Sequence, residues 1–405
     1  MFRRRQFLKR AGLVSLAPMV PVFLDRLAVA NEAKSSNGRI LVVIQLDGGN
    51  DGINTVVPYK DDGYKQFRRE LRLPDSDLIK ITDDFAFHSR LRSASQLLDS
   101  GLLSVVHGVG YPNPNRSHFE SMAIWHVGST DPERRTVGHG WLGEAISTRA
   151  DSTSGQQAIH VGDEALPVAV RGRRCATSTI SSASDLQLRS DLISHISKSH
   201  PLASENVSIE AENSSIADFV ARRVSQAYTS TAELSHLTVQ DASARYPDGQ
   251  LGTRLKLVSQ LIKSNAAAQV NYTLQSGYDT HAGQLATHGN LLGELSSVLR
   301  AFMDDLKQSG LEERVLVMGF SEFGRRVAEN DSLGTDHGTA GPVLLAGAKL
   351  ASRSYGRMPS LTDLEGGDLK YHLDFRHLYG SILTDWLGLE RPAPLQGYQL
   401  PGMFA

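Results

Sequence analysis

The most regular feature of the chain is a set of short apolar runs, rich in Val, Ile and Leu, each followed by a glycine or a polar residue. The runs are Ile40–Leu46, Leu102–Val106, Val270–Leu274, Val315–Phe320 and Pro342–Ala346. Continuous apolar runs of this length are typical of strands buried on both faces. Helical spacing of apolar residues lies between them, at Leu91–Leu98, His118–His126, Leu285–Leu306 and Phe375–Leu387. The alternation predicts an α/β fold with a mostly parallel sheet flanked by helices.

The middle of the chain has a different pattern. Residues 150–265 are rich in Ser and Ala, with two short runs typical of strands, "AIHVG" and "PVAV", followed by mostly helical spacing. We interpret this stretch as a helical insertion or cap on a main domain that spans residues 39–405.

The N-terminus has the pattern of an export signal. Arg4 and Arg5 begin a twin-arginine motif, a moderately apolar stretch follows at Ala11–Leu24, and Ala28-Val29-Ala30 is a small-residue cleavage site. The alternatives are an amphipathic first helix or a membrane anchor, but Pro18 and Pro21 interrupt a stretch already too short to span a bilayer comfortably. We therefore predict a signal peptide at 1–30, a linker at 31–38, and no permanent membrane span. The partner would be the twin-arginine machinery, which would export the folded protein to the periplasm or beyond.

Charge and cysteine content narrow the classes of function. The formal net charge of the 405 residues is −2, and six Lys or Arg with one Asp fall in the first 30, so the remainder carries −7. An acidic body argues against a nucleic-acid partner. Cys175 is the single cysteine, which excludes an intramolecular disulfide and a cysteine-based zinc site. A bound metal would need His, Asp and Glu ligands.

Acidic and imidazole side chains follow the predicted strands. Because ligands bind outside the carboxyl ends of parallel strands, we expect these residues to meet at one edge of the sheet. They are Asp47, Asp279 with His281, Glu322 with Arg325, and the adjacent pair Asp336 and His337. Carboxylates gathered at one edge repel one another unless a cation lies among them. One or two divalent ions would satisfy the set, and zinc, manganese, iron and magnesium all accept such ligands.

Each of these residues also has a structural interpretation. "DGGNDG" around Asp47 reads as a glycine-rich turn, and it lacks the endings of a phosphate loop or a dinucleotide fingerprint. Glu322 and Arg325 have the spacing of a surface ion pair. "SLGTDHGTAG" around Asp336 has the composition of a polar turn. His288, seven residues after His281, is typical of a solvated helix position.

Ser117 is the candidate nucleophile. It stands at the predicted start of a helix, where the dipole stabilises a negative oxygen, and Arg116 precedes it. The competing interpretation is a capping box formed by Ser117 and Glu120. The G-x-S-x-G hydrolase elbow is absent from the sequence. His118 and His126 are interpreted as local packing or hydrogen-bonding residues.

Several longer motifs resemble a known family. "QLDGGNDGINTVVPY", "GVGYPNPNRSHFESMAIW", "YDTHAGQ", "SEFGRRVAEN", "GTDHGTAGP" and "DFRHLYGSILTDWLG" are similar to the family numbered 1501 among domains of unknown function, over residues 39 to 390. The resemblance implies a fold like that of alkaline phosphatases and sulfatases.

The same resemblance assigns roles to individual residues. It implies metal binding by Asp47, Asp336 and His337, and a nucleophile at Ser117. A second metal would take Asp279 and His281 with a distant histidine, for which His372 and His377 are the candidates. The family pattern has its histidine four residues after the aspartate, and here His281 follows Asp279 by two.

Two functions agree with these features. The first is an exported metal-dependent hydrolase of phosphate or sulfate esters, in which Arg116 or Arg325 clamps a small anionic substrate. The second is a non-catalytic secreted or surface binding protein on the same fold, with a structural or degenerate metal site. The number of bound ions beside Ser117 distinguishes them, because a structural site is closed by its ligands while a catalytic site keeps an open position.

Overall fold

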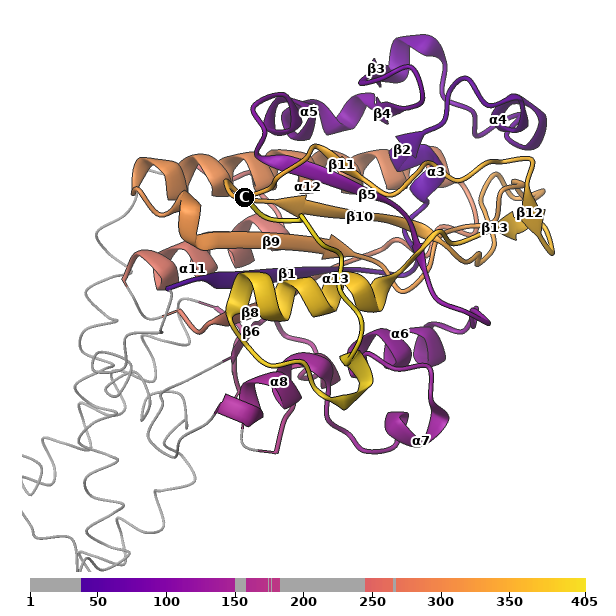
Figure 1. Cartoon of the computed structure of the whole chain (residues 1–405). Coiled ribbons are helices and arrows are strands. Elements are labelled where there is room, and N and C mark those ends of the chain that lie inside the picture. The colour runs from indigo at the N-terminus through magenta and orange to yellow at the C-terminus, as the bar shows by residue number, and fades with distance from the viewer. Residues whose placement is uncertain (1–37, 150–157, 174, 176, 183–244, 265–266) are drawn as a thin grey trace, which may run out of the picture.

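A large, mostly parallel sheet forms the centre of the molecule. The computed structural model describes residues 38–149, 158–173, 175, 177–182, 245–264 and 267–405 (Figure 1). In spatial order the strands are β11 (Ser354–Tyr355), β5 (Leu103–Gly110), β10 (Gly341–Ala346), β9 (Val315–Phe320), β1 (Ile40–Asp47), β8 (Val270–Ser276), β6 (Ala158–Val161) and β7 (Thr177–Ile180). A ninth strand, β14 (Leu373–Asp374), pairs in parallel with β5. β10 is antiparallel to both of its neighbours, and the other pairings within the described sheet are parallel.

Both faces of this sheet are covered by helices, as the continuous apolar runs predict. Along β1, Val42 and Ile44 pack into one core, and Leu41 and Val43 into the other. The first core also holds side chains of α5 (Arg92–Asp99), α11 (Gln250–Lys263) and α12 (Gln284–Gln308). The second holds side chains of α6 (His118–Val127), α8 (Trp141–Arg149), α13 (Phe375–Ser381) and the π-helix Ile382–Leu387 that continues α13 (Figure 1). The predicted α/β class with a mostly parallel, helix-flanked sheet is confirmed.

Smaller elements surround this frame. A three-stranded antiparallel sheet has the order β2 (Val56–Val57), β4 (Ala86–His88), β3 (Leu78–Lys80), and β12 (Leu364–Glu365) pairs with β13 (Asp368–Leu369). Short α-helices are α3 (Gly52–Thr55), α4 (Asp62–Phe67) and α7 (Pro132–Arg135). Single 3-10 turns lie at Asp75–Asp77, Ser89–Leu91, Val168–Val170, Glu312–Arg314 and Ala393–Leu395.

The middle stretch departs from its interpretation in two ways. "AIHVG" forms β6 as predicted, but "PVAV" is a wrong assignment: Pro167 precedes a 3-10 turn at Val168–Val170, and the unpredicted strand is β7. β6 and β7 extend the main sheet, and α11 packs beside α12, so these parts of 150–265 belong to the main domain. Residues 150–157 and 183–244, where the helical cap is expected, lie outside the described residues.

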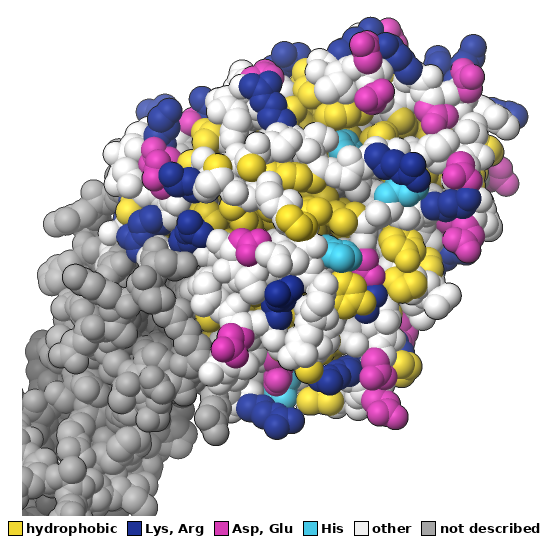
Figure 2. All heavy atoms as spheres, viewed as in Figure 1, with side chains coloured by type: hydrophobic (Ala, Val, Ile, Leu, Met, Phe, Trp, Pro, Cys, Tyr) yellow, Lys and Arg dark blue, Asp and Glu magenta, His cyan; other side chains and the backbone are white. Residues whose placement is uncertain are grey.

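The predicted signal peptide and all but the last residue of the linker also lie outside the described residues. Within the described part of the chain, no helix has the length and apolarity needed to cross a membrane. On the face seen in Figure 2, basic and acidic side chains are interspersed around bands of hydrophobic atoms.

Candidate metal centre

Three loops and the N-terminus of one helix meet at the carboxyl edge of the central strands. The loops that follow β1, β8 and β9 are neighbours there because these strands are adjacent and parallel. Tyr278 N donates to the carbonyl of Asp47 at 3.1 Å, and Gly48 N donates to Glu322 Oε1 at 3.1 Å. Gly48 has φ +115°, and a Cβ there would lie 2.5 Å from the backbone nitrogen of Asp279. Glycine at 48 therefore permits the first two loops to touch. The loop after β9 also carries Asp336, and the N-terminus of α6 completes the edge.

Three imidazole nitrogens converge on one carboxylate oxygen. Asp279 Oδ1 lies 3.2 Å from the Nε2 atoms of both His281 and His337, and 3.5 Å from that of His118. Ligand atoms of His118, Asp279 and His337 all lie within 4.8 Å of one another, the spacing of a group that can hold a metal ion. The sequence predicted that Asp279, His281 and His337 meet at one edge, and they do. His118 was interpreted as a packing or hydrogen-bonding residue; it does bond Glu322, and in addition it belongs to the metal-binding group, which the sequence did not indicate.

Each histidine is oriented by a bond to its other ring nitrogen. His118 Nδ1 lies 2.7 Å from Glu322 Oε1, His337 Nδ1 lies 2.8 Å from the carbonyl of Arg116, and His281 Nδ1 lies 3.3 Å from Asp336 Oδ1. When Nδ1–H donates in this way, the lone pair of Nε2 faces the centre of the cluster. Metal-binding histidines usually donate their other ring N–H to a carboxylate or carbonyl, which fixes the orientation of the ring.

Two observations indicate that this set of ligand atoms fits a divalent cation. His118 Nε2 is buried and makes no hydrogen bond with any described residue. The Nε2 atoms of His281 and His337 lie 2.9 Å apart, although both carry lone pairs when both Nδ1 atoms donate. A cation among the three nitrogens and the carboxylate would satisfy all of them. Mixed imidazole and carboxylate ligands suit zinc, manganese and iron.

The protonation states of Asp279 and His337 agree with a ligand set, whereas His118, whose pKa is raised, must give up a proton before it can bind a metal. Burial disfavours the charged form of Asp279, but the hydrogen bond and the positive charge of Arg325 oppose it, and the pKa of Asp279 is lowered to about 2. Burial lowers the pKa of His337, so its imidazole is neutral near pH 7. The hydrogen bond to Glu322 raises the pKa of His118. An ionised carboxylate and a neutral imidazole are the forms that bind metals.

Arg325 lies behind the cluster rather than facing solvent. Its side chain is fully buried and donates to the carbonyls of Gly49, Thr335 and Tyr278, and to Asp279 Oδ1 at 2.7 Å. These bonds tie the β1, β8 and Asp336 loops together. The geometry thus supports a positioning role for Arg325 and leaves it poorly placed to clamp an anion.

A second, fully buried network supports the same loops and was missed in the sequence. Asp51 forms an ion pair with Arg68 at 2.6 Å, and neither side chain has any exposed surface. Gln284 donates to Asp51, and its Oε1 accepts from Thr280 Oγ1 at 3.1 Å and Thr335 Oγ1 at 2.6 Å. Thr280 lies between Asp279 and His281, and Thr335 precedes Asp336. The network therefore holds two of the loops that carry ligands.

Asp47 lies at the edge of this site. Gln45 Nε2 donates to Asp47 Oδ1 at 2.9 Å, and Gln45 Oε1 accepts from Tyr272 at 2.6 Å. Burial and the charge of Glu322 raise the pKa of Asp47. Asp47 does not belong to the metal-binding group found among the described residues. Its assignment as a ligand stays a prediction.

Asp336 and the remaining histidines have other surroundings. Asp336 is well exposed and accepts from Asn330 Nδ2, so it orients His281 from outside the group. His288 is buried, not solvated: it lies 2.9 Å from Asn50 Oδ1, and burial lowers its pKa to about 4. His372 neighbours Arg357 and His377 neighbours Gln399, so neither supplies the distant ligand expected from the resemblance. His126 packs beside Gln45 as predicted.

Ser117 and Arg116 lie at the rim. Ser117 is the exposed N-cap residue of α6, but its hydroxyl makes no capping bond, and Glu120 pairs with Arg135. The capping-box interpretation is therefore wrong. Ser117 stands between His118 and Arg116, whose carbonyl contacts His337, so the serine adjoins the cluster on both sides. The Arg116 guanidinium pairs with Asp368.

Comparisons with solved structures find distant likenesses. They include the C-terminal periplasmic domain of Escherichia coli EptC in complex with zinc (TM-score 0.43, 10% identity, covering 90% of this chain and 86% of that one). Another is the lipoteichoic acid synthase LtaP of Listeria monocytogenes (TM-score 0.36, 9% identity, covering 90% of this chain and 74% of that one). A third is murine ectonucleotide pyrophosphatase/phosphodiesterase 5 in complex with AMP (TM-score 0.36, 9% identity, covering 91% of this chain and 97% of that one). No curated protein matches the chain. Residues 39–366 match the family described as "Protein of unknown function (DUF1501)", and the chain belongs to that family.

Proposed function

We propose that the protein is an exported metal-dependent hydrolase of phosphate or sulfate esters. The observation that carries the proposal is the convergence of His118 Nε2, His337 Nε2 and Asp279 Oδ1 beside a serine at a helix N-terminus. With His281 as a further ligand, these residues would hold one divalent ion. When bound, the ion supplies a Lewis acid that stabilises negative charge on oxygen.

The chain's own residues supply the other parts of the reaction. Ser117 loses its hydroxyl proton to solvent as its Oγ attacks the phosphorus or sulfur atom of the ester, and the bond from that atom to the alcohol oxygen breaks. The alcohol leaves with a proton from solvent, and water then hydrolyses the seryl intermediate and restores the hydroxyl. The N-terminus of α6 stabilises the anionic group that Ser117 carries. Arg116 donates to the ester oxygens through the guanidinium nitrogens that do not bond Asp368.

The test combines metal content with turnover. Protein exported by its own signal is analysed for zinc, manganese and iron, and then screened against phosphate monoesters, phosphate diesters and sulfate esters. We expect one ion per chain and turnover of at least one ester class. His337→Ala should lose both, and His372→Ala, outside the cluster, should keep both. A wild type with bound metal that hydrolyses no ester would overturn the proposal.

One observation favours the alternative of a binding protein. The described residues bring together a single metal-binding group, and the Ser117 hydroxyl makes no hydrogen bond there with a base that could activate it. In that case the ion would be closed off by four protein ligands. An ion that exchanges no water, with an inactive wild type, would support a structural site.

Export is a separate part of the proposal and rests on the arginine pair in "RRRQFLKR". Replacing Arg4 and Arg5 with Lys should leave folded precursor in the cytoplasm. Mature protein found outside a strain that lacks twin-arginine machinery would contradict this route.

A further inference from the structure

Exposed apolar side chains adjoin the metal cluster. Among the described residues, five large apolar side chains are well exposed: Phe119, Val137, Leu285, Leu333 and Tyr371. All of them except Val137 lie on, or in contact with, the elements that carry the proposed ligands, and we call these four the apolar collar. Single exposed apolar residues are normal on a protein surface, whereas a group of them marks an interaction site.

Phe119 is the most exposed member of the collar. It follows His118 in the first turn of α6, and its side chain is 89% exposed. Ser117 precedes His118, so the ring stands two residues from the proposed nucleophile. An aromatic ring left in water costs free energy that an apolar partner would recover.

Leu333 and Leu285 lie next to each other beside His281. The carbonyl of Leu333 accepts from Gln284 N at 2.8 Å, and Leu285 is the next residue of α12. A Cβ on Gly334 would lie 2.2 Å from the carbonyl carbon of His281. The turn that carries Leu333 therefore packs directly on one of the proposed ligands.

Leucine at position 333 does not serve the stability of the fold. Its φ of +57° lies in the left-handed region, which glycine and asparagine enter at a lower cost. The side chain is 51% exposed, so packing recovers little of that cost. Asn330 already fixes the turn, because its Oδ1 accepts from Ser332 N at 2.9 Å and from Gly334 N at 3.1 Å. These facts favour a role for Leu333 in binding over a role in folding.

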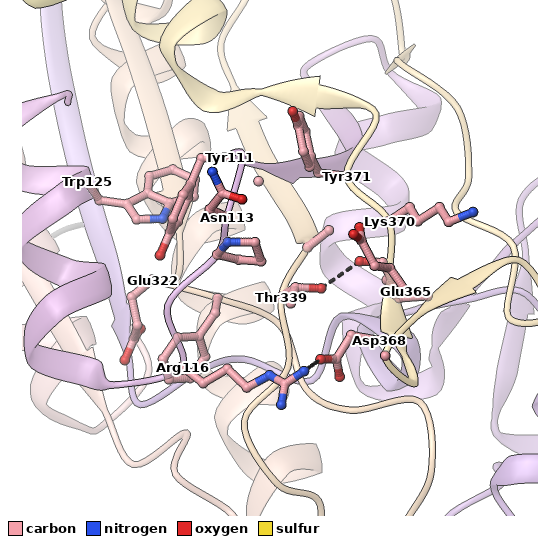
Figure 3. A pocket seen from close by; sticks show the side chains of 16 residues that line it. Tyr111, Asn113, Arg116, Trp125, Glu322, Thr339, Glu365, Asp368, Lys370 and Tyr371 are labelled. Carbon is pink, nitrogen blue, oxygen red and sulfur yellow. Dashed lines mark hydrogen bonds and ion pairs between the residues drawn. The ribbon is translucent and has the colours of Figure 1, made fainter. Parts of the chain in front are cut away.

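Tyr371 connects the collar to a cavity beside the cluster. The cavity measures about 290 Å³, and Tyr371 and Arg116 lie on opposite sides of it (Figure 3). The ring of Phe323, which also lines it, lies 4.9 Å from the rings of His118 and His337. Tyr371 is 38% exposed, so its ring reaches solvent from the cavity wall.

Several charged residues beside the collar are paired with one another. The pairs are Arg116–Asp368, Glu120–Arg135 and Lys370–Asp363. The chain after residue 30 carries a net charge of −7, so an anionic surface would not be attracted to it as a whole. Attraction to the collar must therefore come from apolar contact, and salt should change it little.

A partner of the collar must leave the cluster open to its ester. A protein or a second copy of the chain seated on all four side chains would cover the adjoining ligands. A lipid layer would instead supply the ester, because the head of a lipid is polar and its chains are apolar. Polar ligand atoms with apolar side chains beside them match both parts of such a molecule.

We propose that the apolar collar docks on a lipid surface, and that the ester taken by the cluster belongs to the head of a lipid in that surface. The head would enter the cluster while the chains remain in the layer beside Phe119 and Leu333. The choice of substrate rests on the proposed function. The docking does not, because it requires neither the ion nor turnover.

The experiment measures sedimentation of the protein with phosphatidylcholine vesicles. Protein exported by its own signal is used, so the wild type and every variant carry the same N-terminus. We expect the wild type to bind, and Phe119→Ser and Leu333→Asn each to lower the partition coefficient about five- to tenfold, because an apolar side chain is lost. Leu333→Asn should fold as well as the wild type, since asparagine adopts the left-handed conformation. Phe119→Trp, the matched control, should bind at least as well as the wild type.

Turnover gives a second readout. On a water-soluble ester, Phe119→Ser and Leu333→Asn should match the wild type, and on an ester carried by vesicle lipids both should be slower by the same factor as their loss of binding. No vesicle binding by the wild type, equal binding by the wild type and both variants, or binding abolished by high salt would each overturn the inference. A dimer lost in Phe119→Ser without a change in vesicle binding would assign the collar to a second copy instead.

The outcomes also separate this inference from the proposed function. Vesicle binding through the collar by a protein that hydrolyses no ester would contradict the hydrolase and leave the docking surface standing. Turnover of soluble esters without vesicle binding would do the reverse.

Discussion

Two polar clusters lie at the same edge of the sheet, and they differ in how completely their atoms are paired. In the buried cluster, Asp51, Arg68 and Gln284 have no exposed side chain, and Asp51 accepts from both partners. In the rim cluster, Asp279 is half exposed, and His118 Nε2 makes no hydrogen bond with a described residue. The first is closed to ligands, and the second has lone pairs directed at one point.

This difference indicates that the buried cluster supports the loops and that the rim cluster can bind an ion or ligand. A fully satisfied buried network fixes a single geometry, whereas unpaired donors and acceptors in a native site indicate a missing ion or ligand. The two clusters are connected through Gln284, which binds Thr280 and Thr335 beside the ligand-carrying residues. Damage to the buried cluster should therefore reduce stability, and damage to the rim should reduce binding.

The largest effect is expected in the buried cluster. Asp51→Ala leaves the Arg68 guanidinium buried without its carboxylate, which costs about 3–5 kcal/mol of unfolding free energy. Asp279→Ala, at the rim, should cost less in metal-free protein, because Asp279 is half exposed and the buried Arg325 keeps its bonds to the carbonyls of Gly49, Thr335 and Tyr278. Urea unfolding of both variants measures the contrast. Equal losses would show that the two clusters do not differ in this way.

Added metal should raise the free energy of unfolding through the rim cluster. An ion present at a hundredfold excess over its dissociation constant raises the free energy of unfolding by about 2.7 kcal/mol. The wild type and His372→Ala should show this gain when zinc or manganese is added to chelator-treated protein, and His337→Ala should not. Thermal unfolding with and without metal measures it. An unshifted wild type would argue against any ion at the rim.

The residues that orient the histidines should have graded effects. Glu322 is 1% exposed and holds His118 at 2.7 Å, so Glu322→Gln should lower metal affinity about 10–100-fold. Asp336 is 59% exposed and lies 3.3 Å from His281, so Asp336→Asn should lower it by less. Metal titration by calorimetry compares the two. A larger loss in Asp336→Asn would mean that Asp336 is itself a ligand.

The sequence allowed much of this to be predicted, for physical reasons. Strands buried on both faces carry continuous apolar runs, so β1, β8 and β9 could be predicted from the sequence. Because these strands are parallel, Asp279 and His281 were expected at one edge with His337. His118 could not be found in this way, because a loop separates it from the end of β5 and its helix approaches the edge only in the folded chain. Asp51 is the second aspartate of "DGGNDG", where composition alone indicates a turn.

Local sequence patterns gave wrong predictions where the structure is decided by residues far away in the sequence. A four-residue apolar run such as "PVAV" does not distinguish a strand from a single helical turn. Ser117 and Glu120 have the letters of a capping box, yet Glu120 pairs with Arg135 on the following short helix. The competition between a near and a far partner is decided by tertiary structure.

The smallest change in stability is expected at Ser117, where a large change in activity is expected too. A side-chain N-cap contributes about 1 kcal/mol, but the Ser117 hydroxyl makes no capping bond. Ser117→Ala should therefore cost less than about 0.5 kcal/mol and leave metal affinity nearly unchanged. If Ser117 is the nucleophile, the same variant should lose turnover of any ester that the wild type hydrolyses. Ser117→Asp should also be inactive, although aspartate is a good N-cap. An active Ser117→Asp protein would show that the serine adjoins the metal cluster without taking part in its chemistry.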